Sequence, residues 1–200
     1  IVVTNVPDVF IEEVADHAMM MLLAAGRRMK LMNRMAAEGN WWHGRPILSE
    51  VPRLYGQTLG LLAFGNVSRC MARRAKAFGM NIISHDPYLS ELTISESGVE
   101  PVSFNELLER SDYLSVHAPH NEDTHHIIDA SALAKMPNHS VLINSARGPL
   151  IDESALIDAL QKGEIAAAGL DVLEKRLLKA QRIKLQDQID RMTSLQSVLF

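Results

Sequence analysis

The 200-residue sequence predicts an α/β fold in which helices cover both faces of a doubly wound parallel sheet. Three observations support this fold class. Short apolar runs, typical of strands buried on both faces, alternate with helical patterns from residue 58 onward. A glycine-containing turn joins the first of these strands to the next helix. An acidic residue ends the second strand.

The individual elements follow from local patterns in chain order. Residues 59–63, 81–86, 113–117, 140–144 and 165–172 are predicted strands. Residues 67–78, 104–110, 131–136 and 152–162 are predicted helices. The opening run at residues 1–4 is also typical of a strand. Because it does not begin with Met, this start indicates a piece of a larger protein.

The segment before residue 58 contains one long predicted helix, from Glu12 to Lys30. Apolar residues fill most of its surface between Ala18 and Ala25. A helix that is apolar nearly all round is buried, either in a core or against a second subunit. Residues 38–56 contain two tryptophans, two prolines and three glycines, and we expect them to form an irregular loop.

Composition favours one soluble globular domain, or a domain with an appendage. The chain is 47% apolar, with a formal charge of −4 and a pI near 6.1, so it carries no signal for nucleic acid or membrane binding. Its longest apolar run is far shorter than the roughly 20 residues of a membrane helix. No cationic leader is evident. The single cysteine, Cys70, agrees with a reducing, cytoplasmic setting and is expected to pack inertly, since no basic partner is apparent nearby.

The last stretch, Lys175 to Phe200, contains no Gly or Pro, and Leu178, Leu185, Met192 and Leu199 fall seven residues apart. This spacing predicts an amphipathic helix, with a weak coiled-coil strand, a solvated helix and a partly disordered tail as alternatives. The predicted organisation is a stub with a helix and loop at residues 1–56, a nucleotide-binding domain at 57–174 and a helical tail at 175–200.

The glycine turn is a dinucleotide-binding candidate. It runs Ala63-Phe64-Gly65-Asn66-Val67-Ser68 between strand and helix, so a pyrophosphate can approach Gly65 and the helix N-terminus. Only the middle glycine of the usual Rossmann pattern is kept. Asp86 follows Gly65 by 21 residues and suits the ribose hydroxyls. Because its carboxylate would repel a 2′-phosphate, NAD is favoured over NADP.

Residues 1–174 resemble the D-isomer-specific 2-hydroxyacid dehydrogenases, which include phosphoglycerate dehydrogenases and glyoxylate/hydroxypyruvate reductases. The matching stretches are Val14-Ala15-Asp16-His17, Thr58-Leu59-Gly60-Leu61-Leu62, Arg74-Ala75-Lys76-Ala77-Phe78-Gly79, Asp86-Pro87-Tyr88, Ser115-Val116-His117-Ala118-Pro119, Asn144-Ser145-Ala146-Arg147-Gly148 and Gly169-Leu170-Asp171-Val172. Asn121-Glu122 with Thr124-His125-His126 is similar to the branch of the C-terminal binding proteins, which are NAD-sensing corepressors.

This resemblance implies a set of NAD contacts and no metal. The implied contacts are Phe64, Gly65, Asn66 and Val67 at the pyrophosphate, Asp86 at the ribose, His117, Pro119 and Thr124, the run Asn144, Ser145 and Ala146, and Asp171 near the nicotinamide amide. His117 has the alternative of being an ordinary strand-end histidine. Arg147 is implied as the catalytic-site residue that grips the substrate carboxylate by a two-point contact, with a structural ion pair as its alternative.

Two further groups of the family's chemistry are not matched. Its Glu is expected five residues after Asp171, where this chain has Arg176, and its acid–base His lies in a Thr-Pro-His context that the sequence does not reach. We therefore expect a sheet that is incomplete relative to the family, and little catalysis by this chain alone. The tail from Lys175 suggests a truncated gene product, with a frameshift, an alternative exon, a fusion or a cloning artefact as its source.

Three functional hypotheses remain. The first is an oxidoreductase that transfers hydride between NAD and a small-molecule 2-hydroxy or 2-keto acid. The second is a non-catalytic NAD-sensing module. The third is a truncated product that folds poorly because its sheet lacks the last strand. Since the family packs the helix from Glu12 to Lys30 across its subunit interface, we also expect a homodimer through that helix.

Overall fold

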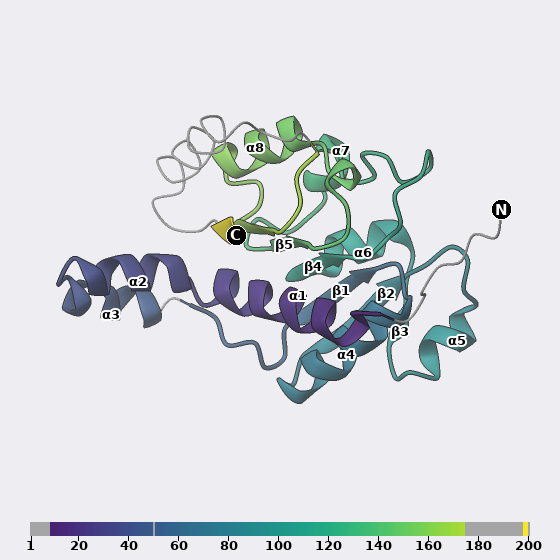
Figure 1. The fold of residues 1–200 in the computed structure, drawn as a ribbon, viewed down its shortest axis with the longest axis horizontal. Coiled ribbons are helices and arrows are strands. Elements are labelled where there is room, and N and C mark those ends of the chain that lie inside the picture. The colour runs from purple at the N-terminus through teal and green to yellow at the C-terminus, as the bar shows by residue number, and fades with distance from the viewer. Residues whose placement is uncertain (1–8, 50, 175–197, 200) are drawn as a thin grey trace.

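A computed structural model describes residues 9–49, 51–174 and 198–199, and it has the predicted α/β architecture (Figure 1). Its single sheet has the strand order β3-β2-β1-β4-β5-β6-β7, and every pairing is parallel. The strands are β1 Thr58–Leu62, β2 Asn81–His85, β3 Glu100–Pro101, β4 Tyr113–Val116, β5 Val141–Asn144, β6 Ala167–Leu170 and β7 Val198–Leu199. The doubly wound Rossmann order is therefore confirmed.

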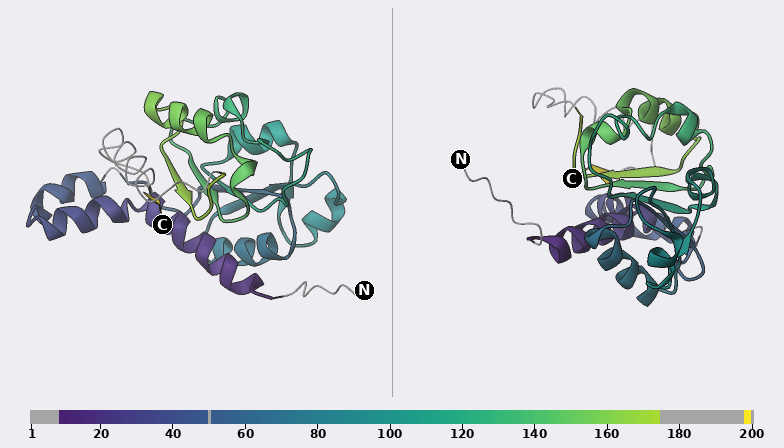
Figure 2. Two further views of the ribbon diagram at one scale, coloured as in Figure 1. Left: turned by 45° about the horizontal axis from the view of Figure 1, so that its top comes forward. Right: turned by 90° about the vertical axis from the view of Figure 1, so that its right-hand side faces the viewer.

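Helices cover the sheet on both faces (Figure 2). One face packs against α1 Ile11–Gly26 and α4 Asn66–Ala77, and the other against α6 Phe104–Arg110, α7 Ala130–Leu133 and α8 Glu153–Lys162. Strands β4, β5 and β6 are buried along their whole length, because helices cover both of their faces. Because both faces of these strands are covered, nearly every position along them is apolar or small, which explains the unbroken apolar runs in the sequence.

Local capping explains where several helices begin and end. Ser103 and Glu106 form a reciprocal capping box at the start of α6. The Asp152 carboxylate accepts from the backbone N–H groups of Ser154 and Ala155, and so begins α8. Gly163 ends α8 with φ +69°, a left-handed conformation that glycine adopts without strain.

The N-terminal segment differs from prediction in two ways. The single helix expected from Glu12 to Lys30 is wrong: it divides into α1 and α2 Met29–Ala37, because Arg28 takes a left-handed conformation with φ +52°. The loop expected at residues 38–56 contains α3 Trp41–Ser49, with Pro46 inside it. Helices α2 and α3 form an arm that extends away from the sheet (Figures 1 and 2).

Two smaller elements complete the described chain. Helix α5 Glu91–Ser95 and the short strand β3 were not predicted, because each is too short to show a period. A 3₁₀ turn spans Gly148–Leu150. None of the helices in the described ranges has the length and apolar character needed to cross a membrane.

The C-terminal prediction is tested only in part. Residues 175–197 and the predicted opening strand at residues 1–4 lie outside the described residues. At the end of the chain, Val198 and Leu199 pair with Gly169 and Leu170 as strand β7 and do not continue a helix. This two-residue strand lies at the edge of the sheet beside β6.

Candidate nucleotide-binding site

The order of the strands defines where a ligand can bind. The chain moves outward from β1 to β2 and β3, then returns to place β4 on the other side of β1. This reversal is a topological switch point, and sheets of this kind bind their ligands there, outside the carboxyl ends of the strands. The predicted site residues follow β1, β2, β4, β5 and β6, so parallel pairing brings them all to this edge.

The turn after β1 shows how the two missing glycines are replaced. Ala63 has φ +69°, a left-handed conformation that favours glycine, and it costs a residue with a side chain about 1–2 kcal/mol. Ser68 is fully buried, and its hydroxyl donates a hydrogen bond of 2.7 Å to the carbonyl oxygen of Ala63. The Ser68 hydroxyl thus holds the turn in its strained conformation.

Gly65 lies at the start of α4 and faces open space. Its backbone is extended, with φ −77° and ψ −167°, so any residue could adopt this conformation. A Cβ atom built on it would meet no atom within 4 Å. Helix α4 receives no side-chain cap, so the positive end of its dipole faces this space. Glycine is therefore not required by the fold here, and the space suits an approaching phosphate.

Asp86, after β2, is held against the turn that follows β1 by hydrogen bonds to the backbone. Its Oδ2 accepts a hydrogen bond of 2.8 Å from the backbone N–H of Phe64. Its Oδ1 accepts one of 2.9 Å from the N–H of Tyr88. A carboxylate has about four lone-pair sites, so both oxygens keep capacity for ribose hydroxyls.

His117, after β4, is held as a neutral imidazole. Its Nε2 lies 2.9 Å from the hydroxyl oxygen of Ser115, and its backbone N–H donates to Leu62. Burial lowers the pKa of His117 from 6.5 to about 4, because the surrounding protein disfavours the charged ring. At neutral pH this side chain can exchange hydrogen bonds with a ligand but carries no charge.

The loop after β5 is built around the buried side chain of Asn144. Its Nδ2 donates to the carbonyl of Arg147 at 2.9 Å, and its Oδ1 accepts from the N–H of Ala146 at 3.0 Å. The hydroxyl oxygen of Ser145 is buried without a hydrogen-bond partner among the described residues. Arg147 is exposed, and its Nη1 donates to the carbonyl of Ala146 at 2.7 Å. Its guanidinium has four further N–H donors to offer a substrate.

Two more predicted contacts lie at this edge. The side chain of Asp171, after β6, lies 3.3 Å from Nε2 of His17 on α1, while its N–H donates to the carbonyl of Asn144. The Thr124 hydroxyl donates to the carbonyl of Pro119 at 2.7 Å and fixes the loop that follows β4.

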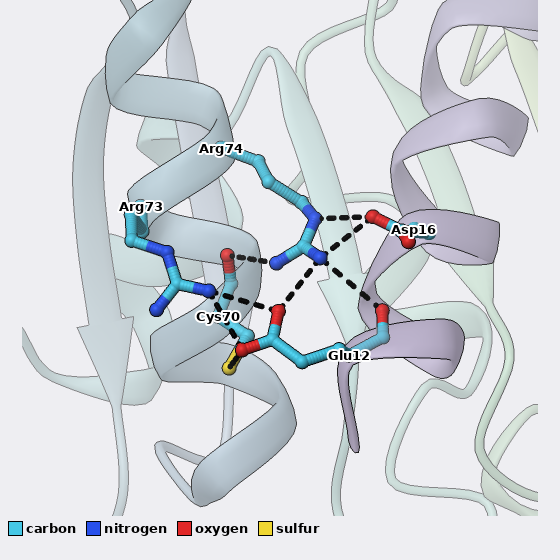
Figure 3. Close-up of polar contacts among 5 residues, drawn as sticks. All are labelled: Glu12, Asp16, Cys70, Arg73 and Arg74. Carbon is cyan, nitrogen blue, oxygen red and sulfur yellow. Dashed lines mark hydrogen bonds and ion pairs between the residues drawn. The ribbon is translucent and has the colours of Figure 1, made fainter. Parts of the chain in front are cut away.

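A polar cluster fastens α1 to α4 beside the glycine turn (Figure 3). Arg73 and Arg74 both bind the Glu12 carboxylate at 2.7 Å, and Arg74 also binds Asp16 at 2.6 Å. These arginines lower the pKa of Glu12 to about 2. Cys70 donates to Glu12 at 3.3 Å, and burial, with this bond, raises the pKa of its thiol. Cys70 therefore has basic neighbours, contrary to prediction, and the raised pKa of its thiol disfavours the nucleophilic thiolate form.

An open groove lies between the first turns of α1 and α4. Its volume is about 490 Å³, and one end of it borders the glycine turn at Asn66. The groove is lined by Phe10, Ile11, Glu12, Glu13, Asn66, Arg69 and Cys70. Arg69 also stacks over the ring of Phe64, with its guanidinium carbon 5.0 Å from the ring centre.

The structure brings the predicted positions to one edge of the sheet, but sequence reasoning missed the contacts that hold these residues in place. Three of these are the Ser68 bond to Ala63, the Asp86 bond to Phe64 and the pairing of His17 with Asp171. His17 belongs to a stretch that carried the family resemblance, which was a usable signal. Nothing in the sequence shows which distant backbone N–H a carboxylate will accept from, because that depends on how the turn folds.

Comparison with known proteins agrees with this arrangement. The family model for the NAD-binding domain of D-isomer-specific 2-hydroxyacid dehydrogenases matches residues 19–195. A glyoxylate reductase of Korarchaeum cryptofilum is 43% identical over 178 residues, which cover 88% of this chain and 53% of that protein. A D-3-phosphoglycerate dehydrogenase of Methanocaldococcus jannaschii is 41% identical over 176 residues, covering 88% and 33%.

Solved structures show the same likeness. The crystal structure of a D-lactate dehydrogenase from Aquifex aeolicus, complexed with NAD and lactic acid, superposes with a TM-score of 0.87 at 29% identity. The match covers 100% of this chain and 61% of that one. The chain thus spans about half the length of the glyoxylate reductase and a third of the phosphoglycerate dehydrogenase.

Proposed function

Because this chain belongs to the D-isomer-specific 2-hydroxyacid dehydrogenase family, as its NAD-binding domain, we propose that NAD lies along the carboxyl edge of the sheet. The protein uses it to interconvert a 2-hydroxy acid and a 2-keto acid. The observation that carries the proposed placement is the open space in front of Gly65, at the positive end of α4 and beside the Asp86 carboxylate.

Each part of the edge has a proposed role toward the cofactor. Phe64, Gly65, Asn66 and Val67 line the pyrophosphate, and Asp86 holds the adenosine ribose. The Ser145 hydroxyl has no hydrogen-bond partner in the described part of the chain and is available to the cofactor, and Asn144 and Ala146 support it. His117, Pro119, Thr124 and Asp171 lie nearer the nicotinamide end. A bound NAD would supply the hydride acceptor.

Arg147 is the proposed substrate-binding residue. Its exposed guanidinium suits a planar two-point contact to a carboxylate, which both 2-hydroxy and 2-keto acids carry. The position expected for the family's Glu holds Arg176, outside the described residues, so we assign no proton-transfer role within this chain.

Substitution of Asp86 tests the cofactor assignment. We expect Asp86→Ala to weaken NADH binding at least about tenfold, because it removes the acceptor for the ribose hydroxyls and the hydrogen bond that holds the Phe64 N–H. Asp86→Asn keeps one acceptor oxygen but removes the charge, so it should narrow the preference for NADH over NADPH. Both are measured by titrating NADH and NADPH fluorescence. A wild-type chain that shows no change at millimolar NADH would contradict the proposal.

The proposed assembly is a homodimer through α1 and the arm formed by α2 and α3. Most of the apolar surface of α1 packs within the chain, against the sheet and α4. Exposed apolar side chains remain on these helices, with Met20 at 39%, Met29 at 51%, Trp41 at 51% and Trp42 at 71% exposure. Tryptophan is enriched in the centres of protein interfaces, which favours a second copy as the partner of this surface.

The dimer is tested by sedimentation velocity. We expect the wild-type chain to sediment as a dimer and Trp42→Ser to shift it toward the monomer, because a serine removes most of the apolar area offered to the partner. Leu92→Ser on α5 is the matched control, since Leu92 is similarly exposed but lies away from the arm. A wild-type monomer at tens of micromolar concentration would refute this assembly.

A further inference from the structure

Three histidines and a glutamate gather beside the carboxyl edge of the sheet. Nε2 of His126 lies 3.1 Å from Oε1 of Glu174, and Nε2 of His120 lies 3.2 Å from Nδ1 of His125. The rings of His125 and His126 stack with their centres 4.0 Å apart. One ligand atom each from His125, His126 and Glu174 lies within 4.8 Å of the others. None of these side chains has a role in the proposed NAD site.

The loop that carries the histidines is held in place by its own hydrogen bonds. Thr124 N–H donates to Oδ1 of Asn121 at 2.9 Å, and Asn121 N–H donates to the Thr124 hydroxyl at 2.8 Å. The N–H of His126 donates to the carbonyl of Pro149 at 2.9 Å. Residues 121–126 therefore present their imidazoles from a fixed turn.

Glu174 reaches the histidines from the segment that follows β6. Its backbone N–H donates to Oε1 of Glu153 at 2.6 Å. The main chain of Leu173 and Glu174 packs onto Gly148, in the space that a Cβ at that position would fill. These two contacts fix the point from which the Glu174 carboxylate extends.

His126 adopts an uncommon backbone conformation, with φ +51°. Residues with a side chain seldom take this left-handed conformation, although histidine does so more readily than most. Such backbone strain is concentrated at ligand and catalytic sites. Here it turns the His126 ring toward Glu174, a residue 48 positions away in the sequence.

We propose that His125, His126 and Glu174 form a binding site for a divalent transition-metal ion, with Zn²⁺ as the best fit. Two imidazole nitrogens and one carboxylate oxygen are a ligand set that Zn²⁺ uses in sites that keep a fourth position open. Tetrahedral ligands 2.0–2.1 Å from the metal are separated by about 3.4 Å. The His126–Glu174 distance of 3.1 Å is already close to this value, and the exposed His125 ring lies beside the His126 ring, with their centres 4.0 Å apart.

His120 supports the same site. Its contact with Nδ1 of His125 places it either as the fourth ligand or as the hydrogen-bond partner that orients a ligand imidazole. A bound ion would join the loop after β4 to the segment after β6, two parts of the chain that share no strand pairing. Metal binding is measured without the cofactor, so the outcome of the titration does not depend on the proposed NAD site.

The test is a Zn²⁺ titration of the 200-residue chain, purified without a histidine tag and stripped with a chelator. We expect one Zn²⁺ per chain in competition with a chromophoric chelator, with a Kd of roughly micromolar or tighter. Excess Zn²⁺ should raise the Tm by roughly 5 °C. Co²⁺ in place of Zn²⁺ should give the visible absorption of a tetrahedral centre.

Matched variants separate this site from scattered surface histidines. Glu174→Gln keeps a hydrogen-bonding group for His126 but removes the anionic ligand. His126→Asn keeps a residue that tolerates the left-handed backbone. We expect each to weaken Zn²⁺ binding at least about tenfold. His139→Asn removes another exposed imidazole, one that pairs with Asp112 at 2.7 Å, and should change nothing.

The outcomes are distinguishable. Loss of the one-to-one Zn²⁺ complex in Glu174→Gln and His126→Asn, with His139→Asn unchanged, supports the site. Equal Zn²⁺ affinity in the wild type and in both ligand variants overturns it, since the His126–Glu174 pair is then a hydrogen bond and nothing more. Dependence of the stoichiometry on His139 also overturns it, because binding is then adventitious. Neither result affects the NADH titration, so the proposed function is judged separately.

Discussion

Gly65→Ala is expected to lower NADH affinity at least about tenfold while leaving the chain folded. The added methyl group points into the space that we assign to the pyrophosphate and meets no protein atom within 4 Å. Because φ at Gly65 is −77°, alanine fits the backbone, and the unfolding free energy should fall by about 1 kcal/mol or less through weaker helix capping. NADH fluorescence titration and urea unfolding measure the two effects.

Gly163→Ala is the matched control for this prediction. A Cβ at Gly163 also meets open space, but φ is +69°, so alanine is strained by about 1–2 kcal/mol. Gly163 ends α8, at the edge of the sheet opposite the cofactor crevice. The Gly163→Ala variant should therefore have a lower unfolding free energy and an unchanged NADH affinity, which is the reverse of the result expected for Gly65→Ala. If Gly65→Ala binds NADH as tightly as the wild type, the pyrophosphate does not lie at this turn.

Acidification from pH 7 to pH 5 is expected to reduce the unfolding free energy by about 2 kcal/mol through His117. The folded-state pKa is about 4, below the ordinary value of 6.5, because burial disfavours the charged ring. The unfolded chain therefore binds more protons between these two values, and stability falls as pH decreases through that window. Above about pH 7 the dependence on this residue disappears.

Urea unfolding at pH 7 and pH 5 measures this effect. His117→Asn should remove most of the difference between the two pH values, whereas His43→Asn, on the exposed surface of α3, should leave it intact. The Glu12 carboxylate does not interfere, since its pKa is lowered from 4.5 to about 2 and its contribution is lost only below pH 4.5. An unchanged pH dependence in His117→Asn would show that its imidazole is not desolvated.

The strands, and the edge of the sheet that carries the candidate site, were predictable because their causes are local. Unbroken apolar runs identify strands that helices cover on both faces, and strand order then places Gly65, Asp86, Arg147 and Asp171 at one edge. The end of α8 was equally predictable, because Gly163 follows the helix and takes the left-handed conformation that commonly ends helices.

Other features depend on contacts that a linear pattern does not contain. The break between α1 and α2 falls at Arg28, an ordinary helix former, and Pro46 lies within α3 although proline usually predicts a loop. Whether Cys70 has charged neighbours depends on the packing of α1 on α4, which brings Glu12 beside Arg73. The grouping of His126 with Glu174 needs the folded sheet to bring two distant segments together.

The bond between Asp86 and the Phe64 N–H constrains how cofactor choice could evolve in this chain. A switch to a phosphorylated dinucleotide calls for loss of the acid at position 86, since its charge repels the 2′-phosphate. Most replacements of Asp86 would also remove the acceptor for the Phe64 N–H and loosen the loop that we propose for the pyrophosphate, a part that both dinucleotides share. Asparagine removes the charge and keeps an acceptor oxygen, so a change of cofactor is expected to pass through asparagine at position 86 or to need a second substitution that restores an acceptor for Phe64.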